Sequence, residues 1–487
     1  MLSLDDRFLL TEEMAEDELP EYGRALNKTW NMLWESGSFS GSVYEYLSVW
    51  HDSFYLFDET RPFMQVLKDK LPMDKINKKD HKPIFGKLLN RRLSESNNKI
   101  SLFSPKYEKD SNKEKLAADE AARWLIAYHG YTGLADKVIF GNEKYKASRG
   151  WLFDIGGISL EGRNLFETLM LNLVLVHKDE RYSCKRQRPC WEYPSSELID
   201  NYMAGKACDN LAQLYTAWSR AVYIDPDIDL TEVFSCEAVK LLKLEHRDFF
   251  LEPMSLWQCN EQGENKNSFI PKKHRLNEAA WRSFGLIALP SVAKKQRQPG
   301  VLEWLNKKKK HIGNIEIGLI ANGMMDDEIL ASQLPADEIH DSLRINDFVL
   351  TNLEKDHWVP RIDEAVEMTK DIINKTYYGF LSDIAEIRNI KEKTRDGFIN
   401  REKEALYFDI DRPFRNWLSN IEMGDDKDEK IMDWYGQLYK MLKLHADKVL
   451  KNSTSRDLRG IEKENVMVNV VTAHNKFIAS INKQLNI

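Results

Sequence analysis

The chain has 487 residues, of which 42% are hydrophobic and 30% charged, a composition that is ordinary for a soluble globular protein. Its length is greater than one compact core usually accommodates, so we expect two domains or more. The formal net charge of −7 at pH 7 argues against a surface that is basic throughout, and no stretch is long and apolar enough to predict a membrane-spanning helix.

The first half of the chain combines predicted helices with polar loops. The first 60 residues predict mostly helix, and residues 68–116 predict a long lysine-rich loop. A helix is expected over Leu116–Tyr128, because apolar residues recur on one face, and it should stop at Gly130 and open into the loop Gly130–Gly133. Three further elements are predicted: a strand pair around a turn over residues 151–162, and helices over 164–176 and 207–222.

Residues 235–345 predict a mixed region with short strands. Strand-like apolar runs occur around Phe249–Leu251 and over Ile315–Ala321. The dipeptide Asn322-Gly323 follows the second run, and it is the strongest short hairpin signal in the chain because type I′ turns favour Asn followed by Gly. We therefore expect a hairpin that turns at Asn322 and Gly323.

From about Asp347 the pattern changes to four long amphipathic helices. Their hydrophobic residues recur at helical spacing in four runs: Ile362 to Ile387, Ile399 to Leu418, Ile431 to Val449, and Val466 to Ile481. Four such helices joined by modest loops predict a four-helix bundle. The expected fold class is α+β, with a large mixed, mostly helical N-terminal domain over residues 1–346 and a C-terminal four-helix bundle over residues 347–487.

The positive charge gathers in two segments. Residues 68–115 carry 14 Lys and Arg against 7 Asp and Glu, and residues 272–310 carry 11 against 2, so the remainder of the chain is strongly acidic. Local basic segments on an acidic body are expected where phosphate binding is confined to part of the surface, although a solvated face gives the same composition. The candidate phosphate-binding residues are Lys78, Lys79, Lys272, Lys273, Lys307, Lys308, Lys309 and Lys310.

Cysteine usage and the first residues indicate a reducing compartment. The chain has five cysteines and no Cys-x-x-Cys pair, which argues against a disulfide framework and against a structural zinc site. The first residues, MLSLDD, lack the basic start and apolar core of a secretion signal. We expect a cytoplasmic protein with reduced thiols and no membrane partner.

Motifs for catalysis are scarce. The sequence contains no phosphate-binding loop, dinucleotide-binding glycine pattern, nucleophile elbow or zinc-protease helix, so we predict no catalytic residue, metal ligand or cofactor. His51-Asp52 is a dipeptide of the kind used in metal-dependent phosphohydrolases, but the other histidines of the 11 are scattered. A phosphohydrolase built on His51 and Asp52, or an RNA-binding scaffold, stays as an alternative to a nucleic-acid-binding subunit without an active site.

Six short segments form an ordered set along the chain that is more specific than any one of them. The segments are Arg61–Gln65 (RPFMQ), Glu120–Ile126 (EAARWLI), Gly162–Leu173 (GRNLFETLMLNL), Arg188–Trp191 (RPCW), Ala280–Arg282 (AWR) and Asp411–Phe414 (DRPF). Together they resemble the CasA family, the large subunit of the type I-E CRISPR surveillance complex called Cascade.

The resemblance implies a subunit without catalysis of its own that joins a larger ribonucleoprotein. Its implied partners are a crRNA, double-stranded target DNA, the other Cascade subunits and a recruited helicase-nuclease. Its implied task is to recognise the protospacer-adjacent motif and to promote duplex opening and R-loop formation. Sequence specificity is then delegated to RNA–DNA pairing, so this subunit needs phosphate contacts and a few groove probes.

The resemblance also assigns site residues by position. A glycine loop would let the backbone approach base edges, and an inserted side chain of a hairpin wedge would unstack a base step. The assigned residues are Gly130, Tyr131, Thr132 and Gly133 for the glycine loop, Asn322, Gly323, Met324 and Met325 for the wedge, Arg247 for the family's lysine finger, and Asn98, Phe103 and Ser104 for the 5′ end of the crRNA.

Overall fold

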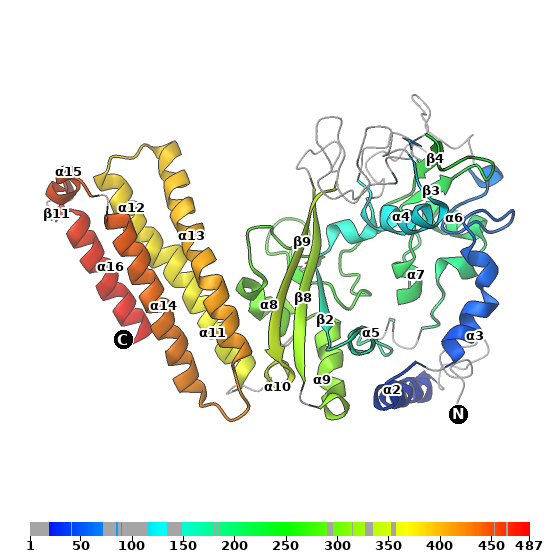
Figure 1. Cartoon of the computed structure of the whole chain (residues 1–487), viewed down its shortest axis with the longest axis horizontal. Coiled ribbons are helices and arrows are strands. Elements are labelled where there is room, and N and C mark those ends of the chain that lie inside the picture. The colour runs from blue at the N-terminus through cyan, green and yellow to red at the C-terminus, as the bar shows by residue number, and fades with distance from the viewer. Residues whose placement is uncertain are drawn as a thin grey trace. The chain divides into compact units, whose positions relative to one another are not determined.

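The chain forms two compact units in a computed structural model (Figure 1). The structure describes residues 19–39, 41–71, 84–85, 89, 115–133, 149–179, 181–182, 185–289, 296–313, 315–326, 335–351, 357–451, 453–463 and 466–487. The first unit comprises Met1–Leu276, Ser291–Ile312 and Ile320–Asp341, and the second comprises Asn277–Pro290, Gly313–Leu319 and Ser342–Ile487. Among the described helices, none combines the length and the apolar character needed to cross a bilayer.

The first unit mixes short helices with small sheets. Its helices are α2 (Leu19–Ser36), α3 (Ser42–Val49), α4 (Ala118–Tyr131), α5 (Leu165–Asn172), α6 (Ser195–Met203), α7 (Leu211–Tyr215) and α9 (Gly300–Ile312). Its strands are β1 (Ile84–Phe85), β2 (Gly157–Glu161), β3 (Arg220–Tyr223), β4 (Ser235–Lys240), β5 (Trp257–Cys259), β6 (Phe269–Pro271) and β7 (Gln296–Arg297). Two longer strands, β8 (Glu316–Asp326) and β9 (Pro335–Asn346), have residues in both units.

These strands form three three-stranded sheets, in the orders β1-β4-β3, β2-β8-β9 and β6-β5-β7. Strands β3 and β4 pair antiparallel, with Arg220 opposite Lys240. The main core of the first unit packs this pair against α4, and it includes the fully buried Leu125, Val222 and Val239. The unit is therefore organised by contacts between segments that lie far apart in the sequence.

Several predictions of local structure in the first unit are wrong. Residues 151–162 form a 3-10 turn, η7 (Trp151–Asp154), and the single strand β2 instead of a strand pair. Residues 207–222 form the short helix α7 and the strand β3 instead of one helix, because β3 finds its partner in β4. Phe249–Leu251 is not a strand, since Phe250 has a backbone φ of 49°.

The second unit is mostly helical. Its elements are η9 (Ala280–Ser283), α8 (Phe284–Ala288), α10 (Asp347–Leu350), α11 (Trp358–Asp371), the π-helical turn η10 (Ile372–Tyr377), α12 (Tyr378–Ile387), α13 (Glu392–Ser419), α14 (Lys427–Leu450), α15 (Ser455–Arg459), β10 (Ile461–Lys463), β11 (Val466–Val468) and α16 (Val470–Leu485). Helix α16 packs on α12 and α14, and α13 packs on the same two helices (Figure 1).

The hydrophobic runs predicted for these helices are buried. Ile384, Leu438 and Ile481 each have 0% exposure, as expected for residues on the apolar stripe of a packed helix. The start predicted for the last helix is wrong, because Val466 belongs to β11 and the helix begins at Val470. The fold is thus a mixture of helices and small sheets, as predicted.

Two of the six resemblance segments meet in the second unit. Trp281, from Ala280–Arg282, is fully buried and donates its indole N–H to Asp411 Oδ1 at 3.0 Å. Its ring also stacks on Phe414, with centroids 4.5 Å apart. Asp411 and Phe414 both belong to the DRPF segment, so these two motifs form one structural contact inside the unit.

Candidate nucleic-acid interface

The predicted glycine loop starts later than its sequence indicates. Helix α4 continues through Gly130 and Tyr131, so only Thr132 and Gly133 follow it within the described part of this segment. The helix begins at Ala118, where the Glu120 carboxylate accepts a hydrogen bond from the free N–H of Ala117 at 3.1 Å. The prediction of a loop over Gly130–Gly133 is therefore wrong for its first two residues.

Two contacts hold the end of α4, one from the backbone of Gly150 and one from the side chain of Arg220. Gly150 donates its N–H to the Thr132 carbonyl at 2.9 Å. Arg220, whose side chain is fully buried, donates to the carbonyl of Gly133 at 2.6 Å and to that of Ser219 at 2.8 Å. A guanidinium at the C-terminal end of a helix also complements the negative end of the helix dipole. The segment that should probe DNA is thus fixed by a buried cation.

The predicted hairpin turn at Asn322-Gly323 is wrong. Both residues lie inside the continuous strand β8, and neither has the positive φ that a type I′ turn requires. Pairing of β8 with β2 and β9 outweighs the local preference of the dipeptide. The connection between β8 and β9 falls in residues 327–334, which lie outside the described residues.

The two methionines assigned to the wedge differ in exposure. Met324 is only 7% exposed and packs on Phe153 and Tyr131, so it forms part of the core instead of an exposed wedge. Met325 is partly exposed on the strand. In a strand successive side chains point to opposite faces, so Met324 and Met325 lie on different faces of the sheet.

The structure nevertheless brings part of the loop and part of β8 to one cavity. This cavity of the first unit has a volume of about 440 Å³. Its lining includes Tyr131 from the end of α4, Asn322 and Gly323 from β8, and Glu252. Asn322 is exposed, and its side chain pairs with His340 Nδ1 at 2.9 Å. Two segments that the resemblance assigned to DNA contact therefore line one cavity.

A network of ion pairs surrounds Asp154, whose neighbour in the chain, Ile155, lines this cavity. Lys273 Nζ is 3.8 Å from Asp154 Oδ1 and 3.7 Å from Asp326 Oδ2, and it lies 4.6 Å from the centre of the Phe153 ring. Arg149 pairs with the same two carboxylates. Burial alone would raise the pKa of Asp154, but the surrounding cations hold it below its ordinary value. Lys273 is thus already partnered, and a phosphate would have to compete with two carboxylates.

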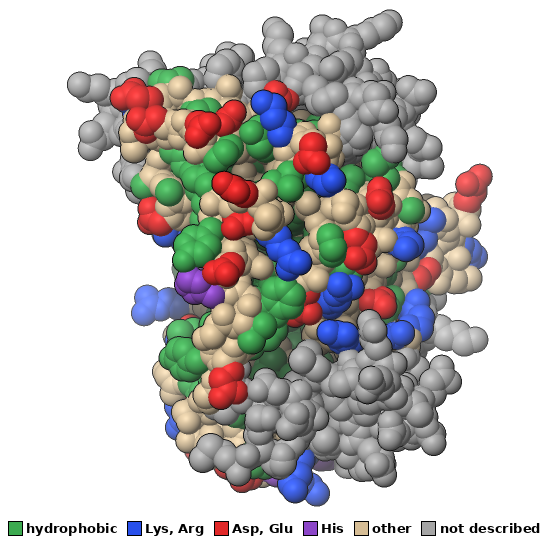
Figure 2. All heavy atoms as spheres, turned by 90° about the vertical axis from the view of Figure 1, so that its right-hand side faces the viewer, with side chains coloured by type: hydrophobic (Ala, Val, Ile, Leu, Met, Phe, Trp, Pro, Cys, Tyr) green, Lys and Arg blue, Asp and Glu red, His purple; other side chains and the backbone are tan. Residues whose placement is uncertain are grey.

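The other residues assigned to nucleic-acid contact differ in exposure, and some of them lie outside the described residues. Arg247 is exposed and donates to Asn265 Oδ1 at 3.0 Å. Lys272 is partly exposed. The assigned residues Asn98, Phe103, Ser104, Lys78 and Lys79 lie outside the described residues. On the face in Figure 2, basic and acidic side chains are interspersed over the described surface.

The lysine run on α9 is not a uniform basic surface. Lys308 is only 3% exposed, and its ammonium lies 4.8 Å from the Trp30 ring and 4.6 Å from the Trp304 ring. It donates to Asn31 Oδ1 at 2.9 Å and to the Asn27 carbonyl at 3.2 Å. The prediction that Lys308 binds phosphate is therefore wrong.

The geometry of helix α9 explains why Lys308 is buried while its neighbours are exposed. With 3.6 residues per turn, four consecutive residues surround the helix, so one of them must face the neighbouring helix α2. The residues that remain exposed are Lys307, Lys309 and Lys310. Burial, with a smaller contribution from Lys307, lowers the pKa of Lys308 to about 8.

This lowered pKa predicts a pH dependence of stability. Because an unfolded lysine titrates near 10.5, folding releases a proton from Lys308 between pH 8 and 10.5, and stability through this group must rise with pH in that window. Relative to a Lys308→Met variant, which cannot titrate there, the wild-type free energy of unfolding should gain on the order of 2 kcal/mol between pH 7 and 9.5. Urea unfolding of wild type and Lys308→Met at each pH gives the two free energies of unfolding. If the difference between them does not change with pH, the expectation is wrong.

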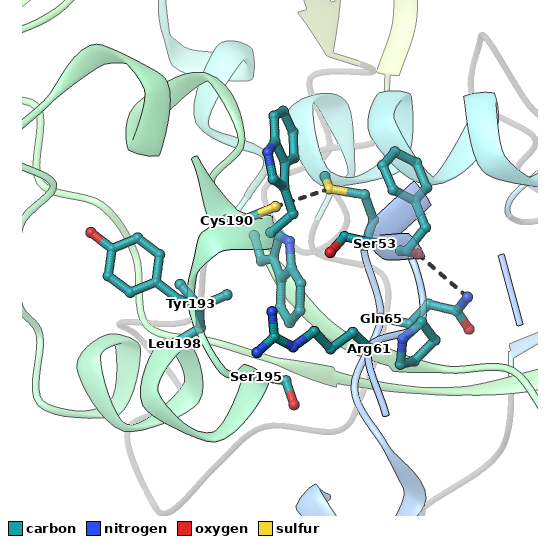
Figure 3. A pocket seen from close by; sticks show the side chains of 12 residues that line it. Ser53, Arg61, Gln65, Cys190, Tyr193, Ser195 and Leu198 are labelled. Carbon is teal, nitrogen blue, oxygen red and sulfur yellow. Dashed lines mark hydrogen bonds between the residues drawn. The ribbon is translucent and has the colours of Figure 1, made fainter. Parts of the chain in front are cut away.

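A second hollow in the first unit lies between two of the resemblance segments, Arg61–Gln65 and Arg188–Trp191 (Figure 3). It has about 30 Å³ of free space, enough for one water molecule. Cys190 Sγ and Met64 Sδ lie 3.4 Å apart across it. Gln65 is buried, donates to the Leu56 carbonyl at 2.8 Å and accepts from the Ile224 N–H at 3.0 Å. These segments therefore build the core.

The phosphohydrolase alternative gains no support from the described residues. His51 and Asp52 are largely exposed, and their nearest side-chain atoms are 3.4 Å apart. In the ranges that the structure describes, no group of three or more His, Cys, Asp or Glu residues could hold a metal ion. A metal-dependent phosphohydrolase needs such a group.

Sequence reasoning missed several residues of the 440 Å³ cavity. Trp151, Tyr215 and Glu252 line it but stand far apart in the chain, and none of them belongs to a motif. Arg220 was missed as well, since nothing in Arg-Ala-Val-Tyr predicts a buried cation. The chain is rich in aromatic residues, with 13 Trp, but this composition does not indicate which of them line a cavity.

Comparisons with known proteins give a consistent result. The family model of the CRISPR-associated protein Cse1 matches residues 19–443. The CRISPR-associated protein CasA/Cse1 of Thermus thermophilus is 30% identical over 171 residues, which are 34% of this chain and only 30% of that protein's length. The similar region thus spans less than a third of this curated relative.

Solved structures resemble the whole chain in fold. The Cse1 structure of Thermobifida fusca has a TM-score of 0.71 at 20% identity and covers 97% of this chain and 92% of its own. A chain of a structure described as a CRISPR RNA-guided surveillance complex has a TM-score of 0.60 at 15% identity. The match covers 96% of this chain and 86% of that one. At these identities the likeness concerns the fold.

Proposed function

The chain belongs to the family of the CRISPR-associated protein Cse1, or CasA, and we propose that it is the large, non-catalytic subunit of a type I-E Cascade complex. In this role it recognises the protospacer-adjacent motif of double-stranded DNA, promotes duplex opening and R-loop formation, and recruits the helicase-nuclease. The crRNA and the other Cascade subunits are its resident partners. A family match over residues 19–443 supports the assignment for most of the chain.

The observation that carries the DNA-contacting role is the meeting of two assigned segments at one cavity. Tyr131 from the end of α4 and Asn322 and Gly323 from β8 all line it. Probing a groove needs a few side chains held rigidly at one place, and both segments are fixed by backbone hydrogen bonds. We assign the motif contacts to Tyr131, Asn322 and Gly323.

Phosphate contacts are assigned to the cations that stay exposed. Arg247, Lys307, Lys309 and Lys310 meet this condition, whereas Lys308 is buried and Lys273 is paired with two carboxylates. The crRNA contact stays with Asn98, Phe103 and Ser104, and further phosphate contacts with Lys78, Lys79 and Lys272. We propose that residues 1–346 carry these contacts and that residues 347–487 form the family's four-helix bundle.

The experiment is a binding measurement on the reconstituted complex. Target duplexes that differ only in the flanking motif are titrated at one fixed salt concentration, because affinity for DNA depends steeply on salt. We expect at least tenfold tighter binding for the preferred motif, since each wrong base pair typically costs about 1–3 kcal/mol. The control is the complex assembled without this chain, which should lose the preference. Equal affinity for all motifs would contradict the assignment.

A further inference from the structure

The cavity beside the end of α4 is large enough to hold a flat ring. Its volume of about 440 Å³ lies within the range of small-ligand pockets, which is roughly 300–1,000 Å³. It is lined by more apolar than polar surface, with polar groups from Glu252, Ser159 and Asn322. The small hollow of Figure 3, by comparison, holds only a water molecule.

Aromatic rings form one wall of this cavity. Trp151 and Tyr215 lie nearly parallel, with their ring centres 5.9 Å apart and an angle of 22° between the planes. Tyr131 contributes a third ring to the lining. Tyr215 is 41% exposed although Trp151 is only 7% exposed, so the pair runs from the core to the opening. Stacked aromatic side chains are the usual platform for an unstacked nucleobase.

A buried carboxyl group supplies polar specificity in the same cavity. Glu252 is only 6% exposed, and it accepts hydrogen bonds from the Tyr215 hydroxyl at 3.0 Å and from Ser255 Oγ at 2.7 Å. Burial raises the pKa of Glu252, although the hydrogen bonds from Ser255 and Tyr215 act in the opposite direction. Each carboxyl oxygen has a second lone pair, so Glu252 can still accept a hydrogen bond from an amino group or ring N–H at the edge of a base.

We propose that this cavity receives one unstacked nucleobase of a bound nucleic-acid strand, with Trp151 and Tyr215 as its stacking platform and Glu252 facing its hydrogen-bonding edge. The inference rests on the proposed function, because that function brings a locally opened duplex to this chain. Tyr131 and Asn322 line the same cavity, so the residues assigned to motif contact would lie next to the accepted base. Flipping a base out of the stack is unfavourable, and least so where the strand is already open.

Photo-crosslinking of the full chain tests the site. A single-stranded oligonucleotide with one 5-iodouracil is mixed with the protein and irradiated, and the attached peptide is identified by mass spectrometry. We expect attachment at Tyr215, Trp151 or Tyr131. If free 5-iodouridine at the same concentration gives an equal yield of crosslink, the cavity binds a free nucleoside as well as a base within a strand. That result would contradict the proposal that the base belongs to a bound strand. Attachment only outside the cavity would overturn the site itself.

Variants distinguish a binding role from a structural one. Tyr215→Ala should lower the yield in the cavity at least fivefold, whereas Tyr215→Phe keeps the ring and should retain most of it. Tyr44→Ala removes a tyrosine that is 76% exposed on α3, and it should leave the yield unchanged. Equal losses in Tyr215→Ala and Tyr44→Ala would overturn the inference, as would a full yield in Tyr215→Ala.

The two proposals can fail separately. The Tyr215→Ala chain is also assembled into the complex, and its binding to the motif series is measured. If wild-type protein shows motif-dependent binding but no crosslink in the cavity, the nucleobase site is wrong and the proposed function stands. If the crosslink forms in the cavity but binding does not depend on the motif, the proposed function is wrong and the cavity is a nucleobase site for another purpose.

Discussion

Replacing Gly150 by alanine should destabilise the protein by about 3 kcal/mol and disrupt the end of α4. A Cβ atom at this position would lie 2.2 Å from the Gly130 carbonyl oxygen and 2.4 Å from the Tyr131 nitrogen. Both are backbone atoms, so relief requires that one chain segment move away from the other. That movement would also break the hydrogen bond from Gly150 to Thr132.

Two measurements check this expectation. Urea unfolding should give the lower stability, and in the reconstituted complex the preference for one flanking motif should weaken, because Tyr131 lies in the displaced segment. The matched control is Gly41→Ala, since nothing lies within 4 Å of a Cβ there and the backbone φ of −57° suits alanine. If the two alanine variants unfold at the same urea concentration, the close approach at Gly150 is not a constraint.

Replacing Arg220 by methionine should have an effect of similar size, about 3 kcal/mol. Methionine has a comparable length but no donor, so the Gly133 and Ser219 carbonyls lose charge-assisted hydrogen bonds in a buried place. Arg220→Lys should fall between wild type and Arg220→Met, because one ammonium cannot reproduce the planar fork of a guanidinium. The free energy of unfolding is measured for wild type, Arg220→Met and Arg220→Lys, and the three values are compared.

An exposed arginine provides the control for this series. Arg123 on α4 pairs with Asp119 one turn earlier, and both side chains are about two-thirds exposed. Such pairs contribute little, so Arg123→Met should leave stability unchanged within error. A loss as large as that of Arg220→Met would mean that the charge of this region, and not the buried hydrogen bonds, determines the effect.

The positions of the charged side chains have a consequence for function. A basic run in the sequence suggests a continuous phosphate-binding surface, but Lys308 is buried between Trp30 and Trp304, and Lys273 is paired with Asp154 and Asp326. Fewer cations are then free to contact DNA than the composition suggests. Under the proposed function, we expect this chain to depend on the other subunits for much of its affinity for DNA.

The sequence by itself determined what depends on short-range periodicity. The apolar stripes of the second unit were predictable because residues three and four apart share one face of a helix, and Ile384, Leu438 and Ile481 are indeed fully buried. The six resemblance segments were sufficient to identify the family, although two pairs of them, around Met64 with Cys190 and around Trp281 with Phe414, turn out to be contacts of the core.

Only the tertiary structure decided which residues share a site. Asn322-Gly323 has the local preference of a turn, yet pairing with two neighbouring strands keeps it in β8. The cavity joins Tyr131, Tyr215, Glu252 and Asn322, and Arg220 reaches Gly133 across 87 positions of the chain. Such contacts depend on packing between distant segments, and no local pattern encodes them, because the free energy of burial is gained only when the whole unit folds.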